Sequence, residues 1–296
     1  MARMGWVTTG DVAEFLEAAG DFLRADRVRN TVLLTVAETA LVNPGIYGAG
    51  SEAGSEASAR QLFGWWTDGQ AGQAVRGAFL HTPPHPLLLS AVPAEPAAEL
   101  AASVLADRPL TGVNGNEDAA TAFAAAWTAR TGGGADVHVR MRLYRLGELT
   151  WPDPPPEGAP RTPGDRDVAL LTDWFEAFAV EVHDMGGEDH EAAVRDKLSY
   201  GGLTLWEADG GSVCLAGVTR QVAGMVRVGP VYTPPRFRGR GYASAATAEV
   251  SRAALAAGAE EVLLYTDLAN PVSNSIYQRI GYLAVEDRVA LSFTGR

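Results

Sequence analysis

The 296-residue sequence contains a single cysteine, Cys214, so an intramolecular disulfide is excluded and a reducing compartment is expected. It also lacks any apolar run of the roughly 20 residues that a membrane-spanning helix needs. Near the start of the chain, Asp11, Glu14 and Glu17 stand where a signal peptide would be apolar. We therefore expect a cytoplasmic protein with no membrane partner.

Positive charge is also scarce, because 24 Lys and Arg residues face 36 Asp and Glu residues, which gives a net charge of −12. Binding to nucleic acid needs a broad basic surface, so no nucleic-acid partner is expected. The basic residues are instead concentrated in one place: Arg236, Arg238 and Arg240 lie within five residues. In an acidic protein, this cluster indicates a local binding site for an anion.

Two other kinds of site are poorly supported by the sequence. His81 and His85 are close together, but the prolines between them prevent a shared helix face and no cysteine joins them, so no metal site is expected. The pattern Gly239-x-Gly241-x-x-Ser244 lacks the third glycine of a dinucleotide fingerprint. A nicotinamide site is therefore disfavoured.

The length and one proline-rich stretch predict two domains. A chain of 296 residues exceeds the size at which one hydrophobic core stops growing, so two domains of about 150 residues are expected. Prolines are dense at 152–160, where neither a helix nor a central strand can continue. We therefore predict a first domain at 1–150, a linker at 151–166 and a second domain at 167–296.

In the second domain, apolar periodicity predicts helices at 167–182, 190–200, 242–257 and 271–280, and strands at 203–207, 213–218, 222–233, 262–266 and 289–293. The first three strands should be antiparallel, with a bulge at Gly229 and Pro230. The strand, helix and strand from 222 to 266 form a crossover unit, so those two strands should be parallel. Cys214 should be a buried thiol on a strand.

The first domain repeats part of this order, with strands predicted at 86–93, 110–113 and 137–143 and helices at 95–106 and 116–131. We interpret it as a second copy of the same fold. Residues 93–98 have no glycine pair and include Glu95, which would repel a phosphate. The copy should therefore serve a structural or acceptor-shaping role.

The most informative segment is the run PPRFRGRGYA at 234–243, set between a strand and a helix. Gly239 and Gly241 let the backbone approach a ligand closely, and the amides that open a helix favour an anion. The segment is therefore typical of a loop that holds a pyrophosphate.

This loop resembles the Arg/Gln-x-x-Gly-x-Gly/Ala signature of the GCN5-related N-acetyltransferases, with Arg238, Gly241 and Ala243 at the defining positions. Residues 270–282 resemble the second signature of that family, Asn-x-x-Ala/Ser-x-x-Leu/Ile-Tyr-x-x-x-Gly-Phe/Tyr. The resemblance implies an α/β protein with a mixed sheet: two such domains in tandem, each mostly antiparallel with one splayed parallel strand pair, flanked by helices.

The resemblance also implies an acetyl-CoA-dependent enzyme that transfers an acetyl group directly to a primary amine of a small molecule or peptide, without a metal. Tyr277 would be the general acid that protonates the leaving thiolate. The residues implied to bind acetyl-CoA are Val231, Tyr232, Thr233, Arg238, Gly239, Arg240, Gly241, Tyr242, Ala243, Ser244, Asn270, Ser273 and Tyr277.

Several questions stay open at the level of sequence. The general base is one of a group of polar residues on the elements expected to line the acceptor side: Glu176, Glu181, His183, Asp184 and Glu207. A non-catalytic CoA-binding sensor or assembly module is the alternative, although Tyr277 favours an enzyme because a sensor has no thiolate to protonate. The acceptor, the acyl-chain length and the oligomeric state are not determined, and a homo-oligomer is compatible with the sequence.

Overall fold

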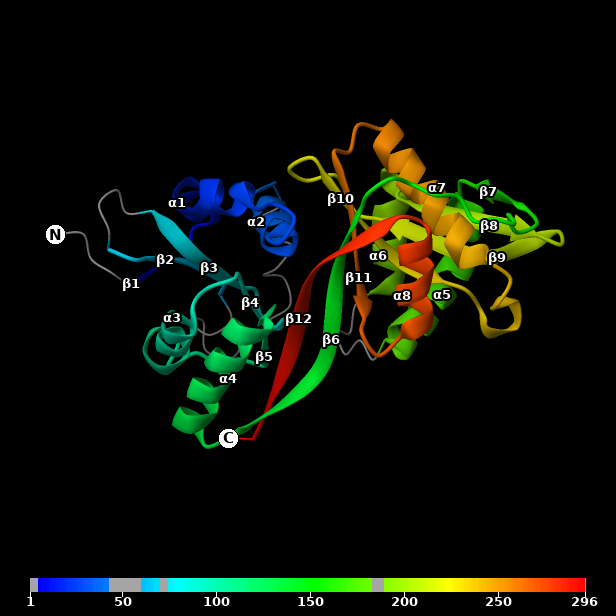
Figure 1. Cartoon of the computed structure of the whole chain (residues 1–296). Helices are drawn as coiled ribbons and strands as arrows, with labels where there is room; N and C mark the ends of the chain where they lie inside the picture. Colours follow the sequence, from blue (N-terminus) through cyan, green and yellow to red (C-terminus); the bar gives the residue numbers. More distant parts are fainter. Residues whose placement is uncertain (1–4, 43–59, 70–73, 183–188, 296) are drawn as a thin grey trace. The chain divides into compact units, whose positions relative to one another are not determined.

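The computed structural model describes residues 5–42, 60–69, 74–182 and 189–295. The chain divides into two compact units, of which unit 1 comprises Met1–Arg142 with Glu286–Arg296 and unit 2 comprises Leu143–Val285. The predicted domains divide the chain by sequence order, whereas these units divide it by contacts. Each unit is described separately below, with the labels of Figure 1.

Unit 1 begins with β1 (Gly5–Thr9), α1 (Val12–Ala25), α2 (Thr31–Val42), β2 (Leu62–Thr67) and β3 (Val75–His81). It continues with β4 (Leu87–Leu89), α3 (Ala94–Glu99) followed by a π-helical turn (Leu100–Val104), β5 (Gly112–Asn116), α4 (Glu117–Thr131) and the first part of β6 (Gly134–Leu146). The neighbouring strands β1 to β4 are antiparallel, and β4 and β5 are parallel.

The last part of β12 (Tyr282–Thr294) completes unit 1 by pairing antiparallel with β5. The strand predicted at 289–293 was expected to complete the second domain instead. Its place in unit 1 has a packing reason, because Phe293 stacks on Trp127 of α4 with ring centroids 4.0 Å apart, and Val289 and Leu291 enter the same core. Burying each such side chain contributes about 1.5–3 kcal/mol.

Unit 2 contains β7 (Ala159–Arg161), a 3-10 turn (Asp165–Asp167), α5 (Val168–Glu181), α6 (His190–Ser199), β8 (Leu203–Ala208) and β9 (Gly211–Val218). Next come β10 (Met225–Tyr232), a 3-10 turn (Pro235–Phe237), α7 (Tyr242–Ala256), β11 (Glu261–Asp267) and α8 (Pro271–Arg279). The strands follow the order β6-β11-β10-β9-β8-β7. As in unit 1, the sheet is mostly antiparallel with one parallel pair, here β10 and β11, as predicted.

Alternating side chains of the unit 2 strands build a core on each face of the sheet. On one face, Leu205, Leu215 and Tyr232 pack with Trp174 and Phe175 of α5. On the other face the core holds, among others, Cys214, Ala216, Val228, Tyr242, Ala246 and Val250, with Tyr277 packed against it. Cys214 is therefore a buried strand thiol, as predicted, on the face that α7 covers.

The parallel pair in unit 2 separates at the predicted bulge. β10 pairs with β11 from Met225 to Val228, and its register on β9 shifts between Val228 and Val231. Beyond the shift, Val231 and Tyr232 pair with β9. The last residues of β10 therefore lie beyond the stretch that pairs with β11, and the two parallel strands diverge there.

Both halves of the chain follow the same order of elements, namely one strand, two helices, three strands, a helix, a strand, a helix and a strand. The order of elements is thus repeated along the chain. The short strand β7 lies within the predicted linker at 151–166 and pairs with β8 as the outer strand of its sheet. Pro160 is tolerated there because an edge strand has one side that forms no ladder hydrogen bonds.

Candidate functional site

The glycine-rich loop of unit 2 connects the diverging end of β10 to α7. Gly239 and Gly241 have φ angles of +75° and +84°, in the left-handed region where only glycine is comfortable. Gly239 and Gly241 are exposed, as are Arg238 and Arg240. The backbone of this loop is thus both bent by its glycines and open to a ligand.

The start of α7 has backbone amides without intrahelical acceptors. The bond from the Ala245 amide to the Gly241 carbonyl belongs to the first turn of the helix, and Gly241, at the N-cap position, offers no side chain to cap it. By contrast, α4 and α8 are capped by the side chains of Asn116 and Asn270. An uncapped helix N-terminus with its positive dipole end is suited to bind an anion.

Arg238 is held by two partners in this loop. Its Nε donates to the carbonyl of Thr233, 2.8 Å away, and its Nη2 forms an ion pair with Glu181, the last residue of α5. Both side chains of this ion pair are close to half exposed, at 47% and 43%. The guanidinium of Arg238 is therefore held by the end of β10 and the end of α5 rather than free in solvent.

The other two arginines of the cluster have weaker partners. Arg240 approaches Asp209 at 3.9 Å, and both side chains are more than half exposed. The guanidinium of Arg236 lies over the ring of Phe237, 4.7 Å from its centroid. Of the three arginines of the predicted cluster, Arg238 is thus the most firmly positioned.

Tyr277 of α8 lies against the core beneath α7. Its ring meets that of Tyr282 edge-on with centroids 6.1 Å apart, and the Tyr282 hydroxyl shares a 2.7 Å hydrogen bond with Ser251. Burial raises the pKa of Tyr277 above that of an ordinary phenol, and the nearby Cys214 raises it further. The phenol therefore stays protonated at neutral pH and can donate a hydrogen bond.

Cys214 connects this tyrosine to the end of β10. The hydroxyl of Thr233 donates to the Cys214 sulfur at 3.2 Å, while burial raises the pKa of the thiol to about 12. A thiol that stays protonated is a poor nucleophile, so Cys214 is structural. Thr233 thus contacts Arg238 through its carbonyl and Cys214 through its hydroxyl, which joins the loop to the surroundings of Tyr277.

The N-terminus of α8 is organised by asparagines. The Oδ1 of Asn270 accepts a 3.0 Å bond from the Ser273 amide, so this residue is a helix cap whatever else it contacts. Asn274 accepts a 2.9 Å bond from the hydroxyl of Tyr144, which in turn accepts from Gln278. Tyr144 was not singled out from the sequence, because it lies 130 residues from Asn274 and the contact has no local signature.

The five candidate bases differ in their surroundings. Glu176 is exposed on α5, Glu181 is paired with Arg238 as above, and Glu207 is paired with Arg161 at 2.6 Å. His183 and Asp184 lie outside the described residues. Two of the three described candidates are therefore engaged by arginines.

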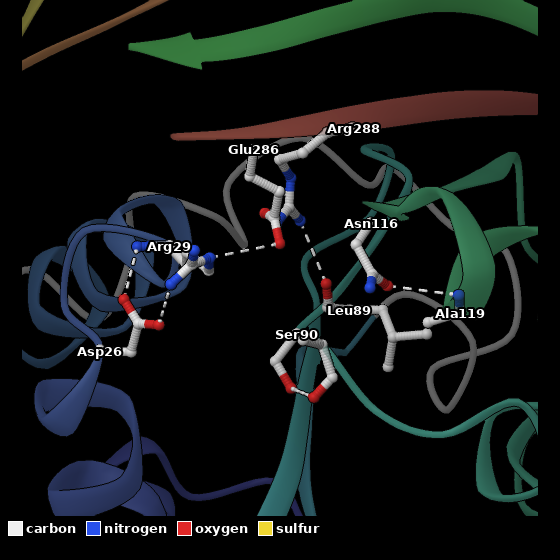
Figure 2. Close-up of polar contacts among 9 residues, drawn as sticks. Asp26, Arg29, Leu89, Ser90, Asn116, Ala119, Glu286 and Arg288 are labelled. Atoms are coloured by element: carbon white, nitrogen blue, oxygen red, sulfur yellow. Dashed lines mark hydrogen bonds and ion pairs between the residues drawn. The ribbon is translucent and has the colours of Figure 1, made fainter. Parts of the chain in front are cut away.

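In unit 1, a side chain of the protein itself lies at the end of the corresponding parallel strand pair, β4 and β5. β4 pairs with β5 at Leu87 and Leu88, and beyond this point the guanidinium of Arg288, only 4% exposed, donates to the carbonyl of Leu89 at 3.1 Å. Figure 2 shows Arg288 between this carbonyl and Glu286, which also approaches Arg29 at 3.8 Å. A buried guanidinium thus occupies the space beside the end of β4.

Unit 1 also differs at the positions that matter most in unit 2. Seven residues after the capping asparagine, α4 carries Phe123 where α8 carries Tyr277. An open groove of about 940 Å³ lies between the segment 91–94 and α4, and its lining includes the carboxylates of Glu117 and Asp118. These acids would repel a pyrophosphate, and phenylalanine has no proton to donate.

Within residues 5–42, 60–69, 74–182 and 189–295, no three His, Cys, Asp or Glu residues gather as metal ligands would. No helix in those same segments is long and apolar enough to cross a membrane.

The arrangement of elements is the fold of the GCN5-related N-acetyltransferases. The family model described as FR47-like protein matches residues 207–290, which include β9, β10, the glycine loop, α7, β11 and α8. No curated protein matches the sequence.

Three solved structures share this fold over nearly the whole chain. A Drosophila protein aligns with a TM-score of 0.66 at 13% identity over 99% of each chain. A GCN5-related N-acetyltransferase from Sphaerobacter thermophilus aligns with a TM-score of 0.59 at 15% identity, covering 97% of this chain and 95% of its own. A GNAT-family acetyltransferase from Colwellia psychrerythraea aligns with a TM-score of 0.54 at 11% identity over 98% and 99%.

Proposed function

We propose that this protein is an acetyl-CoA-dependent N-acetyltransferase whose active site lies in unit 2. The observation that carries the proposal is the combination of an uncapped, glycine-bent helix N-terminus at α7 with a diverging parallel strand pair and the protonated phenol of Tyr277. An anion site, an extended groove wall and a proton donor are the three features that a CoA thioester requires.

The fit to acetyl-CoA can be assigned by segment. The pyrophosphate would accept hydrogen bonds from the amides of the glycine loop and of the first turn of α7, from Arg238 to Ser244. The end of β10, from Val231 to Thr233, would pair with the two amides of the pantetheine arm, which otherwise lose their water partners. Asn270 and Ser273, at the start of α8, would contact the arm from the other side.

The reaction would be a direct transfer. A primary amine attacks the thioester carbonyl, a backbone amide near the end of β10 polarises its oxygen, and the C–S bond breaks as the N–C bond forms. An ordinary alkyl amine has a pKa near 10, so a base or water chain must first remove a proton from its ammonium form. The acceptor is proposed to be a small molecule or a peptide, and the chemistry needs no metal.

Tyr277 would stabilise the departing thiolate. A thiol has an ordinary pKa of about 8.5, well below the raised pKa of this phenol, so complete proton transfer from Tyr277 is uphill. Its main contribution is therefore a hydrogen bond to the sulfur as negative charge develops. The attacking nitrogen loses its remaining proton to the base or water chain as the amide forms, and the released thiolate takes a proton from water at neutral pH, since the ordinary pKa of a thiol is about 8.5.

The second candidate is a CoA-binding sensor or assembly module. It is favoured by one observation: Glu181 and Glu207 are both held by arginines, so neither is ready to accept a proton from an amine. The two candidates agree about CoA binding and differ about turnover.

A screen for free-thiol release from acetyl-CoA, with amines, amino acids, aminoglycosides and peptides as acceptors, tests the proposal. Turnover with at least one amine is expected. Thermal stabilisation by CoA without turnover across the panel would favour the sensor. A protein that shows neither stabilisation by CoA nor turnover would contradict both candidates.

A further inference from the structure

The ion pair between Glu181 and Arg238 joins two segments that the proposed function treats separately. Arg238 opens the glycine loop that would hold the pyrophosphate, and Glu181 ends α5, a helix that packs on the opposite face of the sheet from α7. The guanidinium meets this carboxylate through Nη2 and the Thr233 carbonyl through Nε. The guanidinium of Arg238 is thus already paired with a carboxylate of the protein itself.

A carboxylate in that position opposes a bound pyrophosphate in two ways. It occupies a guanidinium nitrogen that could donate to phosphate oxygens, and it places a negative charge beside a ligand that carries several. Because both side chains are nearly half exposed, the pair contributes little to folding stability and can open at little cost. The pair is therefore well suited to exchange partners.

The position of Arg238 does not depend on Glu181 alone. The 2.8 Å bond from Nε to the Thr233 carbonyl anchors the guanidinium at the end of β10. When the carboxylate leaves, this bond can keep the side chain beside the loop, so the removal of Glu181 should not disorganise the site. The Thr233 carbonyl thus shares the positioning of Arg238 with Glu181.

Other acids near the loop are less suited to this role. Asp209 approaches Arg240 only at 3.9 Å, with both side chains more than half exposed. Glu207 is tied to Arg161 at 2.6 Å, an arginine that is also bound to Asp167. Glu181 alone among these three carboxylates contacts an arginine of the family signature at hydrogen-bond distance.

We propose, on the basis of the proposed function, that Glu181 is an internal competitor for the pyrophosphate of the cofactor. Its carboxylate holds Arg238 in the free protein and is displaced when the pyrophosphate binds the guanidinium. This ion pair sets the affinity for CoA below the value that the loop alone would give. Glu181, one of the five candidate bases, then has a role in cofactor binding.

Titration calorimetry with CoA on the full-length protein tests the proposal. Glu181→Gln keeps the size of the side chain and removes its charge, and it should tighten CoA binding by about threefold to tenfold. Binding of pantetheine, which lacks the pyrophosphate, should not change. Asp173→Asn, an exposed charge removal on the same helix, should leave the affinity for CoA within about twofold of wild type.

A double-mutant cycle separates the specific contact from a general effect of charge. In an Arg238→Gln background, Glu181→Gln should tighten CoA binding much less than in the wild type, because no guanidinium remains to be released and only the charge repulsion is relieved. Unchanged or weaker CoA binding by Glu181→Gln would overturn the proposal, as would equal tightening by Asp173→Asn or a gain of the same size without Arg238. If the wild-type protein binds no CoA at all, the proposed function fails and this inference fails with it.

Discussion

At the residue scale, the chemistry of the proposed site depends on a few side chains whose environments differ from those of free amino acids. Tyr277 and Cys214 lie together in the core beneath α7, and burial raises the pKa of both. The same effect has opposite consequences for function. It keeps the phenol available as a donor, and it makes the thiol unreactive.

Substitution of Tyr277 by Phe should lower kcat about 100-fold while changing the Kd for CoA less than about twofold, since it removes a transition-state hydrogen bond and little packing. Steady-state rates with an acceptor identified by the screen, together with calorimetry, would measure both. A parallel loss of CoA affinity, or unchanged turnover, would contradict the role assigned to this phenol.

Cys214 should resist thiol reagents in the native protein. At pH 8 a free thiol is partly ionised, whereas the thiol of Cys214, with a pKa of about 12 and no exposed surface, should react only after unfolding. The rate of reaction with a chromogenic disulfide reagent, measured with and without urea, tests this. Rapid labelling of the folded protein would show that the thiol is accessible after all.

At the element scale, local patterns predicted most helices and strands of unit 2, because caps and apolar periodicity are local properties. The predicted helix at 242–257 and the strand at 262–266 correspond to α7 and β11 within about one residue at each end. Contacts such as that between Glu181 and Arg238, 57 residues apart, have no local signature. The sequence alone therefore does not identify the partner of each charged residue, and the structure does.

Gly241 offers a direct test of the loop. Gly241→Ala places a Cβ at a φ of +84°, which should cost about 1–2 kcal/mol of stability and weaken CoA binding by at least tenfold, since the amides of α7 would shift. Gly210→Ala, in the turn between β8 and β9 with a φ of +78°, should have the same cost in stability and no effect on CoA. Similar effects of both variants on CoA affinity would contradict a specific role for the loop.

The connection between β7 and α5 should make stability depend on acid pH. Arg161 binds Asp167 through paired 2.8 Å bonds and lowers the pKa of that carboxyl from 3.8 to about 2. Because the folded pKa is lower than the unfolded one, the contribution of roughly 2 kcal/mol is complete above pH 3.8 and is lost as the pH falls through 2.

Urea unfolding at several pH values measures this contribution. Asp167→Asn should flatten the dependence of unfolding free energy on pH between about 4 and 2, and Asp165→Asn, an exposed neighbour in the same turn, should not. An unchanged pH dependence in Asp167→Asn would show that the ion pair does not stabilise the fold.

At the scale of the whole molecule, the sequence indicated a repeat but could not indicate in which unit the end of the chain packs. The repeated order of elements and the loss of the glycine pair in the first copy were predicted from composition and pattern. Glu286–Arg296 pack in unit 1 because β12 pairs with β5 and Phe293 stacks on Trp127. Each of these contacts joins residues that are far apart in the sequence. The buried Arg288 beside β4 could not be anticipated for the same reason.

We propose CoA binding in only one of two similar units. Unit 1 has Phe123 in place of a phenol, acids in its groove and Arg288 at the end of β4, whereas unit 2 has the glycine loop and Tyr277. The stoichiometry of CoA binding, measured by titration calorimetry on the intact chain, tests this most directly. One CoA per chain is predicted, with binding abolished or strongly weakened by Gly241→Ala; two per chain, none, or binding indifferent to that substitution would contradict the account.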